Sequence, residues 1–138
     1  MFLLDTNVVS ELRKAARCDA RVTAWQAAQK PEACFLSVIT LLEIRLGIEL
    51  ARKSDREKAG VLEAWFEQRV KPGFAGRVIE VDEKISEMCG RLHAQRPRSF
   101  RDGLILSTAA VHALTVVTRN VKDFADSGVA VIDPWASA

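Results

Sequence analysis

Long apolar runs are missing from this chain of 138 residues. No stretch approaches the roughly 20 apolar residues that a membrane-spanning helix needs. The first residues also lack the basic region followed by an apolar segment that is typical of a secretory signal. Internal repeats and low-complexity linkers are absent as well, and the length suits one hydrophobic core. We therefore expect a single domain over residues 1–138, located in the cytoplasm and with no membrane partner.

Cysteine and histidine are also scarce. The three cysteines, Cys18, Cys34 and Cys89, lie far apart and do not have the paired spacing of a zinc site or a disulfide framework. His93 and His112 fall in helical patterns away from the acidic residues described below, so we expect structural roles for both. The chain lacks a glycine-rich phosphate loop, a nucleophile elbow and a Ser-His-Asp order. A net charge of +2 is too small to indicate a polyanionic partner by itself.

Short apolar runs alternate with helical patterns along the chain. The runs predict strands at residues 2–4, 33–36, 77–81, 115–118 and 129–132. Short connections and right-handed crossovers between such elements give an α/β fold, with a mostly parallel five-stranded sheet covered by helices on both faces. Helices are expected to begin near Thr6, Asp19, Ser37, Ser54, Asp82 and Asp102.

Three acidic residues stand at the ends of predicted elements. Asp5 directly follows the apolar run of the first strand, and the carboxyl ends of strands in open α/β sheets are the usual site of chemistry. Asp102 stands at the start of an apolar helix, and Asp123 lies one short turn after the fourth strand. Taken alone, Asp5 could simply cap the following helix, and Asp102 could complement the helix dipole.

A fourth acid, Glu43, falls on an apolar stripe of the helix that begins near Ser37. Helical spacing places it in line with Ile39, Leu46 and Leu50. Burying an unpaired carboxylate would cost several kcal/mol, so something cationic should compensate it. An ion pair with an arginine, such as Arg45 or one from another helix, is one explanation.

The four acids together suggest a second explanation. Right-handed crossovers can bring such positions to one end of the sheet, where two carboxylates about 4 Å apart repel by roughly 4 kcal/mol at an effective dielectric near 20. Oxygen ligands without nearby histidine or cysteine favour a hard cation, Mg²⁺ or Mn²⁺. Such an ion activates water and stabilises charge on a phosphodiester oxygen, so the cluster predicts metal-dependent phosphodiester hydrolysis.

Four segments resemble, in the right order, the successive motifs of the PIN domain. They are Leu4-Asp5-Thr6-Asn7, Thr40-Leu-Leu-Glu-Ile-Arg-Leu-Gly47, Asp102-Gly-Leu-Ile105 and Thr118-Arg-Asn-Val-Lys-Asp-Phe124. The chain resembles more narrowly the VapC and FitB toxin branch, including the closing Val131-Ile-Asp-Pro-Trp135. This resemblance implies a Mg²⁺- or Mn²⁺-dependent endoribonuclease, the toxin of a type II toxin–antitoxin pair. It further implies an RNA substrate, inhibition by a cognate VapB- or FitA-like antitoxin, a homodimer, and DNA contact only through the antitoxin.

The resemblance also assigns the metal ligands. Asp5, Glu43 and Asp102 match the acidic positions of the family pattern. The fourth position differs, because many members have an aspartate where this chain has Asn120. We expect Asp123 to be the fourth ligand and Asn120 to be a weaker candidate.

Further residues would support these ligands or bind the substrate. Hydrogen bonds from Thr6, Asn7 and Thr118 would orient the carboxylates. The basic segment before the third acid could hold the RNA backbone near the scissile phosphate, or it could be a solvated loop or an antitoxin contact. Its arginines are Arg96, Arg98 and Arg101.

Two other functions fit parts of the sequence. Phosphatases of the haloacid-dehalogenase type also begin with an apolar strand that ends in aspartate, but they place a second aspartate two residues later, where this chain has Asn7. A non-catalytic alternative is the scaffold half of a FitAB-like complex that binds operator DNA through its antitoxin. The complete set of acids favours catalysis without excluding this second role.

Overall fold

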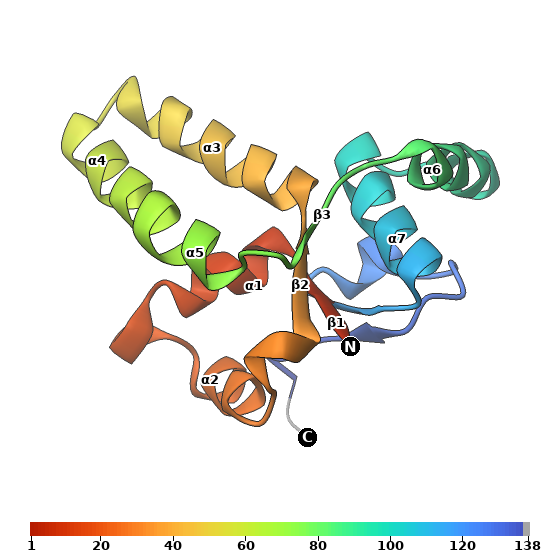
Figure 1. The fold of residues 1–138 in the computed structure, drawn as a ribbon, viewed down its shortest axis with the longest axis horizontal. Helices are drawn as coiled ribbons and strands as arrows, with labels where there is room; N and C mark the ends of the chain where they lie inside the picture. The colour runs from red at the N-terminus through yellow and green to blue at the C-terminus, as the bar shows by residue number, and fades with distance from the viewer. Residues whose placement is uncertain (137–138) are drawn as a thin grey trace.

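β1 (Phe2–Leu4) lies at the centre of a five-stranded sheet with the strand order β3-β2-β1-β4-β5 (Figure 1). The computed structural model describes residues 1–136. The predicted parallel α/β fold is confirmed, although β3 and β5 are shorter than the apolar runs that predicted them. The remaining strands, each parallel to its neighbours, are β2 (Cys34–Ser37), β3 (Val78–Ile79), β4 (Thr115–Val117) and β5 (Val131–Ile132).

Helices fill the connections between the strands. Among residues 1–136, the α-helices are α1 (Thr6–Leu12), α2 (Ala20–Ala27), α3 (Val38–Arg52), α4 (Arg56–Trp65), α5 (Lys71–Gly73), α6 (Glu83–Gln95) and α7 (Phe100–His112). Short 3₁₀ helices form η1 (Ala15–Arg17), η2 (Pro31–Ala33) and η4 (Val121–Phe124), and a π-helical segment, η3 (Phe66–Val70), joins α4 to α5. In this part of the chain, no helix is long and apolar enough to cross a membrane.

Two predicted helix starts differ from the observed N-caps, one by a single residue and the other by three residues. Asp55, and not Ser54, caps α4, because its carboxylate accepts a hydrogen bond from the third amide of the helix. The last helix begins before Asp102, since the hydroxyl of Ser99 accepts a hydrogen bond from the amide of Asp102 at 3.1 Å. Asp102 therefore lies inside the first turn of α7. Three predicted starts are observed N-caps, namely Asp19, Ser37 and Asp82.

Side chains of β1 alternate between two cores, one on each face of the sheet. Leu4 packs with Ile48 and others on the face covered by α1 to α5. Leu3 packs with Ile105 and others on the face covered by α6 and α7 (Figure 1). Because both faces of the sheet are covered, β1 is apolar throughout.

The register of the central strands brings two polar residues together. Leu4 of β1 pairs with Val117 of β4, so the residues that follow, Asp5 and Thr118, leave the sheet side by side. The amide of Asp5 still donates to the carbonyl of Val117 at 2.9 Å. α1 and α3 also begin at this carboxyl edge of the sheet, because each directly follows a strand.

Replacing Leu3 by alanine tests this arrangement of the core. Leu3 is completely buried, so Leu3→Ala should lower the free energy of unfolding by about 3 kcal/mol through lost apolar contacts and a cavity. Val61 is 61% exposed on α4, and Val61→Ala should change that free energy by less than about 0.5 kcal/mol. Urea denaturation of both variants measures the difference, and similar values for the two would contradict the described packing.

Candidate active site

The carboxylate of Asp5 is almost fully shielded from solvent and is fixed by hydrogen bonds. Only 5% of its surface is exposed. As N-cap of α1, its Oδ1 accepts a hydrogen bond from the amide of Thr6 at 2.8 Å. Its Oδ2 accepts from the hydroxyl of Thr118 at 2.8 Å and from the side-chain amide of Asn7 at 3.3 Å. Asp5 thus caps the helix and also binds to the end of β4.

Thr118 connects Asp5 to the loop that follows β4. Its hydroxyl oxygen accepts hydrogen bonds from the Asn7 side chain at 3.2 Å and from the amide of Asn120 at 3.0 Å. The side-chain oxygen of Asn7 in turn accepts from the amide of Arg119 at 3.3 Å. The loop carrying Asn120 is therefore fixed relative to Asp5 by the side chains of Thr118 and of Asn7 in α1.

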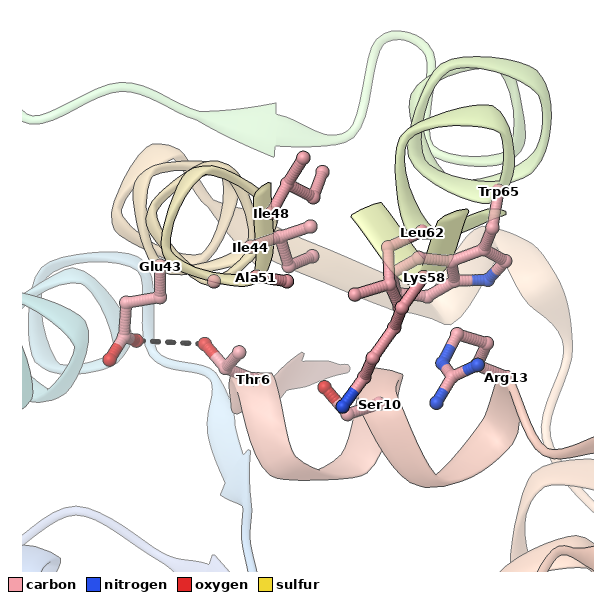
Figure 2. Close-up of a pocket in the computed structure, with 11 residues that line it drawn as sticks. Thr6, Ser10, Arg13, Glu43, Ile44, Ile48, Ala51, Lys58, Leu62 and Trp65 are labelled. Carbon is pink, nitrogen blue, oxygen red and sulfur yellow. Dashed lines mark hydrogen bonds between the residues drawn. The ribbon is translucent and has the colours of Figure 1, made fainter. Parts of the chain in front are cut away.

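Glu43 approaches the same strand end from α3. Figure 2 shows its carboxylate directed toward Thr6, whose hydroxyl donates to Oε1 of Glu43 at 2.8 Å. The other oxygen, Oε2, lies 3.8 Å from the guanidinium of Arg101. Arg45, the partner considered from the sequence, forms ion pairs with glutamates of α3, α4 and η3 instead. The cation near Glu43 is therefore Arg101, which directly precedes Asp102 on α7.

The apolar stripe assigned to α3 from the sequence is only partly buried, since Ile39 lies in the core. Ile44 and Ile48 face the core, whereas Leu46 and Leu50 of the predicted stripe are exposed. Glu43 is partly buried, with 22% of its side chain exposed. Its carboxylate lies at the border between the core and the solvent, where a ligand can reach it.

Asp102 is a third acid whose charge affects Asp5. Burial raises the pKa of Asp5, and the charges of Glu43 and Asp102 raise it further, while hydrogen bonds from Thr118 and Thr6 lower it. The net result is a pKa of about 6, compared with an ordinary value of 3.8. Negative charge at this strand end is therefore incompletely balanced.

The two candidates for a fourth acidic position lie in the loop after β4. Asp123 is exposed in η4, and its amide donates to the carbonyl of Asn120 at 3.0 Å. Asn120 is tied to the network around Asp5 by its backbone, through Thr118. Both residues line a polar cavity of about 380 Å³ together with Asp133, which the sequence analysis did not single out. Ligation by Asp123 remains a prediction.

The acidic side chains near Asp5 are chemically suited to bind a hard divalent cation, but they do not surround a common point. Within residues 1–136, no three acidic, histidine or cysteine side chains form a ready metal-binding group. The carboxylate oxygens of Asp5 and Glu43 accept hydrogen bonds from Thr6, Thr118 and other donors. Carboxylate oxygens are nevertheless the ligands that Mg²⁺ and Mn²⁺ prefer. Burial and, to a smaller extent, the charges of Glu43 and Asp102 raise the pKa of Asp5. The donor chemistry of these carboxylates therefore fits such an ion.

Two of the predicted RNA-binding arginines have an intramolecular role. The guanidinium of Arg96 donates to the carbonyls of Ala125 at 2.9 Å and Lys122 at 2.8 Å. Arg98 donates to the carbonyls of Asp123 and Ala125, both at 3.1 Å. These bonds hold η4 against the connection between α6 and α7, a role that the sequence analysis did not predict. Contact of these arginines with RNA remains a prediction.

A cavity of about 270 Å³ adjoins Glu43 between α1, α3 and α4 (Figure 2). Its walls combine apolar side chains such as Ile44 and Trp65 with polar groups. Figure 2 shows Lys58 reaching from α4 toward Ser10 of α1. The sequence analysis missed this cavity, because its lining comes from three helices whose packing is not visible in local patterns.

The raised pKa of Asp5 predicts a particular dependence of stability on pH. Because the pKa is higher in the folded protein, the stabilising contribution is complete below the unfolded value of 3.8 and is lost as the pH rises through about 6. Without divalent cations, the wild-type protein should lose about 1 to 2 kcal/mol between pH 4.5 and 8 relative to Asp5→Asn. Urea unfolding across this pH range measures the difference. Asp126→Asn, at an exposed acid, should keep the wild-type profile, and a parallel profile for Asp5→Asn would contradict the assignment.

Comparison with known proteins identifies the family of this chain. The PIN domain model matches residues 2–128. Toxin FitB of Neisseria gonorrhoeae is 37% identical over 140 aligned positions, covering 98% of this chain and 99% of FitB. VapC ribonuclease Y4jK of Sinorhizobium fredii is 38% identical over 143 positions, covering 100% of both chains. The structure of FitAB bound to the IR36 DNA fragment contains a chain with a TM-score of 0.88 and 36% identity, covering 100% of this chain and 98% of that one. The chain therefore belongs to the PIN-domain family, in the group that includes Toxin FitB and the VapC ribonucleases.

Proposed function

We propose that this chain is a Mg²⁺- or Mn²⁺-dependent endoribonuclease and the toxin of a type II toxin–antitoxin pair in the cytoplasm. The observation that supports the proposal is that Thr6 hydrogen-bonds both Asp5 and Glu43 at the carboxyl edge of the sheet. The charges of Glu43 and Asp102 also raise the pKa of Asp5. The relative named VapC ribonuclease matches the chain over its whole length. An acid cluster at this edge is a suitable site for phosphodiester hydrolysis.

The three acids would be the metal ligands, with Asp123 or Asn120 as a fourth. The bound ion would supply activation of water and neutralisation of charge on the phosphodiester. Donors from Thr118 and Thr6 favour the ionised form of Asp5, and the hydroxyl of Thr6 also fixes Glu43. These hydrogen bonds would orient the carboxylates toward a common point.

Arg101 is the basic residue best situated to contact the substrate. Half of its side chain is exposed, and its guanidinium lies near Glu43. Phosphate oxygens of RNA are strong acceptors for arginine. We assign Arg101 to the RNA backbone, while Arg96 and Arg98 support the loop that carries Asn120.

A second function follows from the partners of the relatives. FitAB is a complex that binds a DNA fragment, and one of its chains is similar to this chain over its full length. We infer a cognate FitA- or VapB-like antitoxin as the inhibitor, with DNA bound only through it, and a homodimer of this chain. The cavity between α1, α3 and α4 lies beside Glu43, so an antitoxin segment placed there would obstruct the site. This scaffold function does not require catalysis.

Replacing Asp5 tests the nuclease directly. Wild-type protein should cleave single-stranded RNA with Mg²⁺ or Mn²⁺, stop on addition of EDTA, and recover when the ion is restored. Asp5→Asn should lower kcat/KM at least about 100-fold, because a metal ligand is lost. Asp126→Asn is the matched control and should retain activity. Equal cleavage by wild type and Asp5→Asn, or cleavage that EDTA does not stop, would refute the proposal. An inactive variant that still binds DNA together with its antitoxin would retain the scaffold role.

Arg101 provides a test of the metal site that does not need activity. Its positive charge near Glu43 opposes an incoming cation, so Arg101→Gln should tighten Mn²⁺ binding about two- to fivefold, the size of an exposed charge interaction. Arg101→Lys should remain close to wild type. Arg91→Gln removes an exposed charge that faces Glu87 and controls for net charge. Electron paramagnetic resonance of free Mn²⁺ measures the affinities, and unchanged or weaker binding by Arg101→Gln would contradict this placement of the ion.

A further inference from the structure

Phe100 is a large apolar side chain that remains exposed at the start of α7. Its exposed fraction is 66%. On one side, the imidazole of His93 from α6 stacks against the phenyl ring, with centroids 4.7 Å apart and an angle of 16° between the planes. The stack restrains the orientation of the phenyl ring and supports one of its faces. The exposure of the ring leaves contact area for another planar group.

The residues around Phe100 are basic. Arg98 precedes it by two positions and is fixed by hydrogen bonds to the carbonyls of Asp123 and Ala125. Arg101 follows it directly, with half of its side chain exposed. The acid next in sequence, Asp102, belongs to the candidate active site. An exposed aromatic ring between two arginines is the combination with which proteins bind single-stranded nucleic acid, through base stacking and phosphate contacts.

Phe100 is also close to the proposed site of cleavage. It shares the first turn of α7 with Asp102, and two residues along an α-helix differ by about 3 Å along the axis. They lie on roughly opposite sides of the helix, with Arg101 between them. An RNA strand with a phosphate near Asp102 would pass Arg101, at the N-terminal end of α7, before it reached the phenyl ring of Phe100. The ring is therefore suited to a neighbouring base and not to the reacting phosphate.

We propose that Phe100, supported by His93, is a stacking platform for an unpaired base of the RNA, one or two nucleotides from the bond that is cleaved. This inference rests on the proposed ribonuclease function. A base inside a duplex does not offer its face, so the platform selects single-stranded or unpaired RNA. The two flanking arginines favour a polyanion over an apolar protein segment on this surface.

Binding to oligouridylates carrying one 2-aminopurine tests the platform, because stacking on an aromatic ring tolerates different bases. In Asp5→Asn protein with Mg²⁺, fluorescence should be quenched when the label occupies one or two particular positions. Adding Phe100→Ala should remove the quenching and weaken binding about tenfold. Phe100→Trp should preserve both properties, whereas Phe100→Leu, which is apolar without a ring, should behave like the alanine variant. Val61→Ala, at another exposed apolar residue, is the control for surface hydrophobicity.

The outcomes separate the platform from the nuclease. In the active protein, Phe100→Ala should raise KM about tenfold and change kcat less than about twofold, since stacking contributes equally before and during the reaction. Unchanged RNA affinity in Phe100→Ala, or wild-type affinity in Phe100→Leu, would overturn the platform. A change of oligomeric state in light scattering with unchanged RNA affinity would assign the ring to a protein interface. Binding that depends on Phe100 without any cleavage would keep the platform and reject the nuclease.

Discussion

The parallel pairing of β1 with β4 is the constraint on which the candidate site depends. It places Leu4 beside Val117, so that Asp5 and Thr118, although 113 residues apart, meet through a hydrogen bond of 2.8 Å. A buried carboxylate needs such donors, because burying an unpaired charge costs several kcal/mol. Thr118 and Thr6 donate hydrogen bonds to Asp5, yet burial and the charges of Glu43 and Asp102 keep its pKa raised. The carboxylate is thus held rigidly where positive charge is in short supply.

The proposed cation site would depend on these fixed donors and on the neighbouring acids. Thr6 has two functions, since its amide binds Asp5 and its hydroxyl binds Glu43. One residue of α1 therefore sets the relative position of carboxylates from β1 and α3. Arg101 adds a positive charge from the α7 side, but at 3.8 Å and with half of its side chain exposed it balances Glu43 only in part. Binding a divalent ion would relieve the remaining repulsion.

Local patterns in the sequence predicted the sheet and its first acid, because an apolar run that ends at an acid is contained within four residues. They did not predict the orientation of α3. This helix is apolar on most of its sides, so the 3.6-residue period alone cannot select which face meets the sheet. The packed structure buries Ile44 and Ile48, and the stripe of Leu46 and Leu50 is exposed. The sequence left the partner of Glu43 open between Arg45 and an arginine of another helix, and in the structure it is Arg101 of α7.

The connection between α6 and α7 shows why side-chain roles are harder to predict than elements. Its basic composition suggested RNA binding, yet Arg96 and Arg98 use their guanidinium groups on carbonyls of the turn at η4. These carbonyl groups become partners only because two loops pack together, so residue spacing in the sequence does not predict them. Arg101, one turn later, points to Glu43, and Phe100 stacks on His93. Four side chains between Arg96 and Arg101 thereby join α3, α6, α7 and η4. Since these elements carry Glu43, Asp102 and the loop after β4, the geometry of the acid cluster depends on this short connection as much as on the sheet.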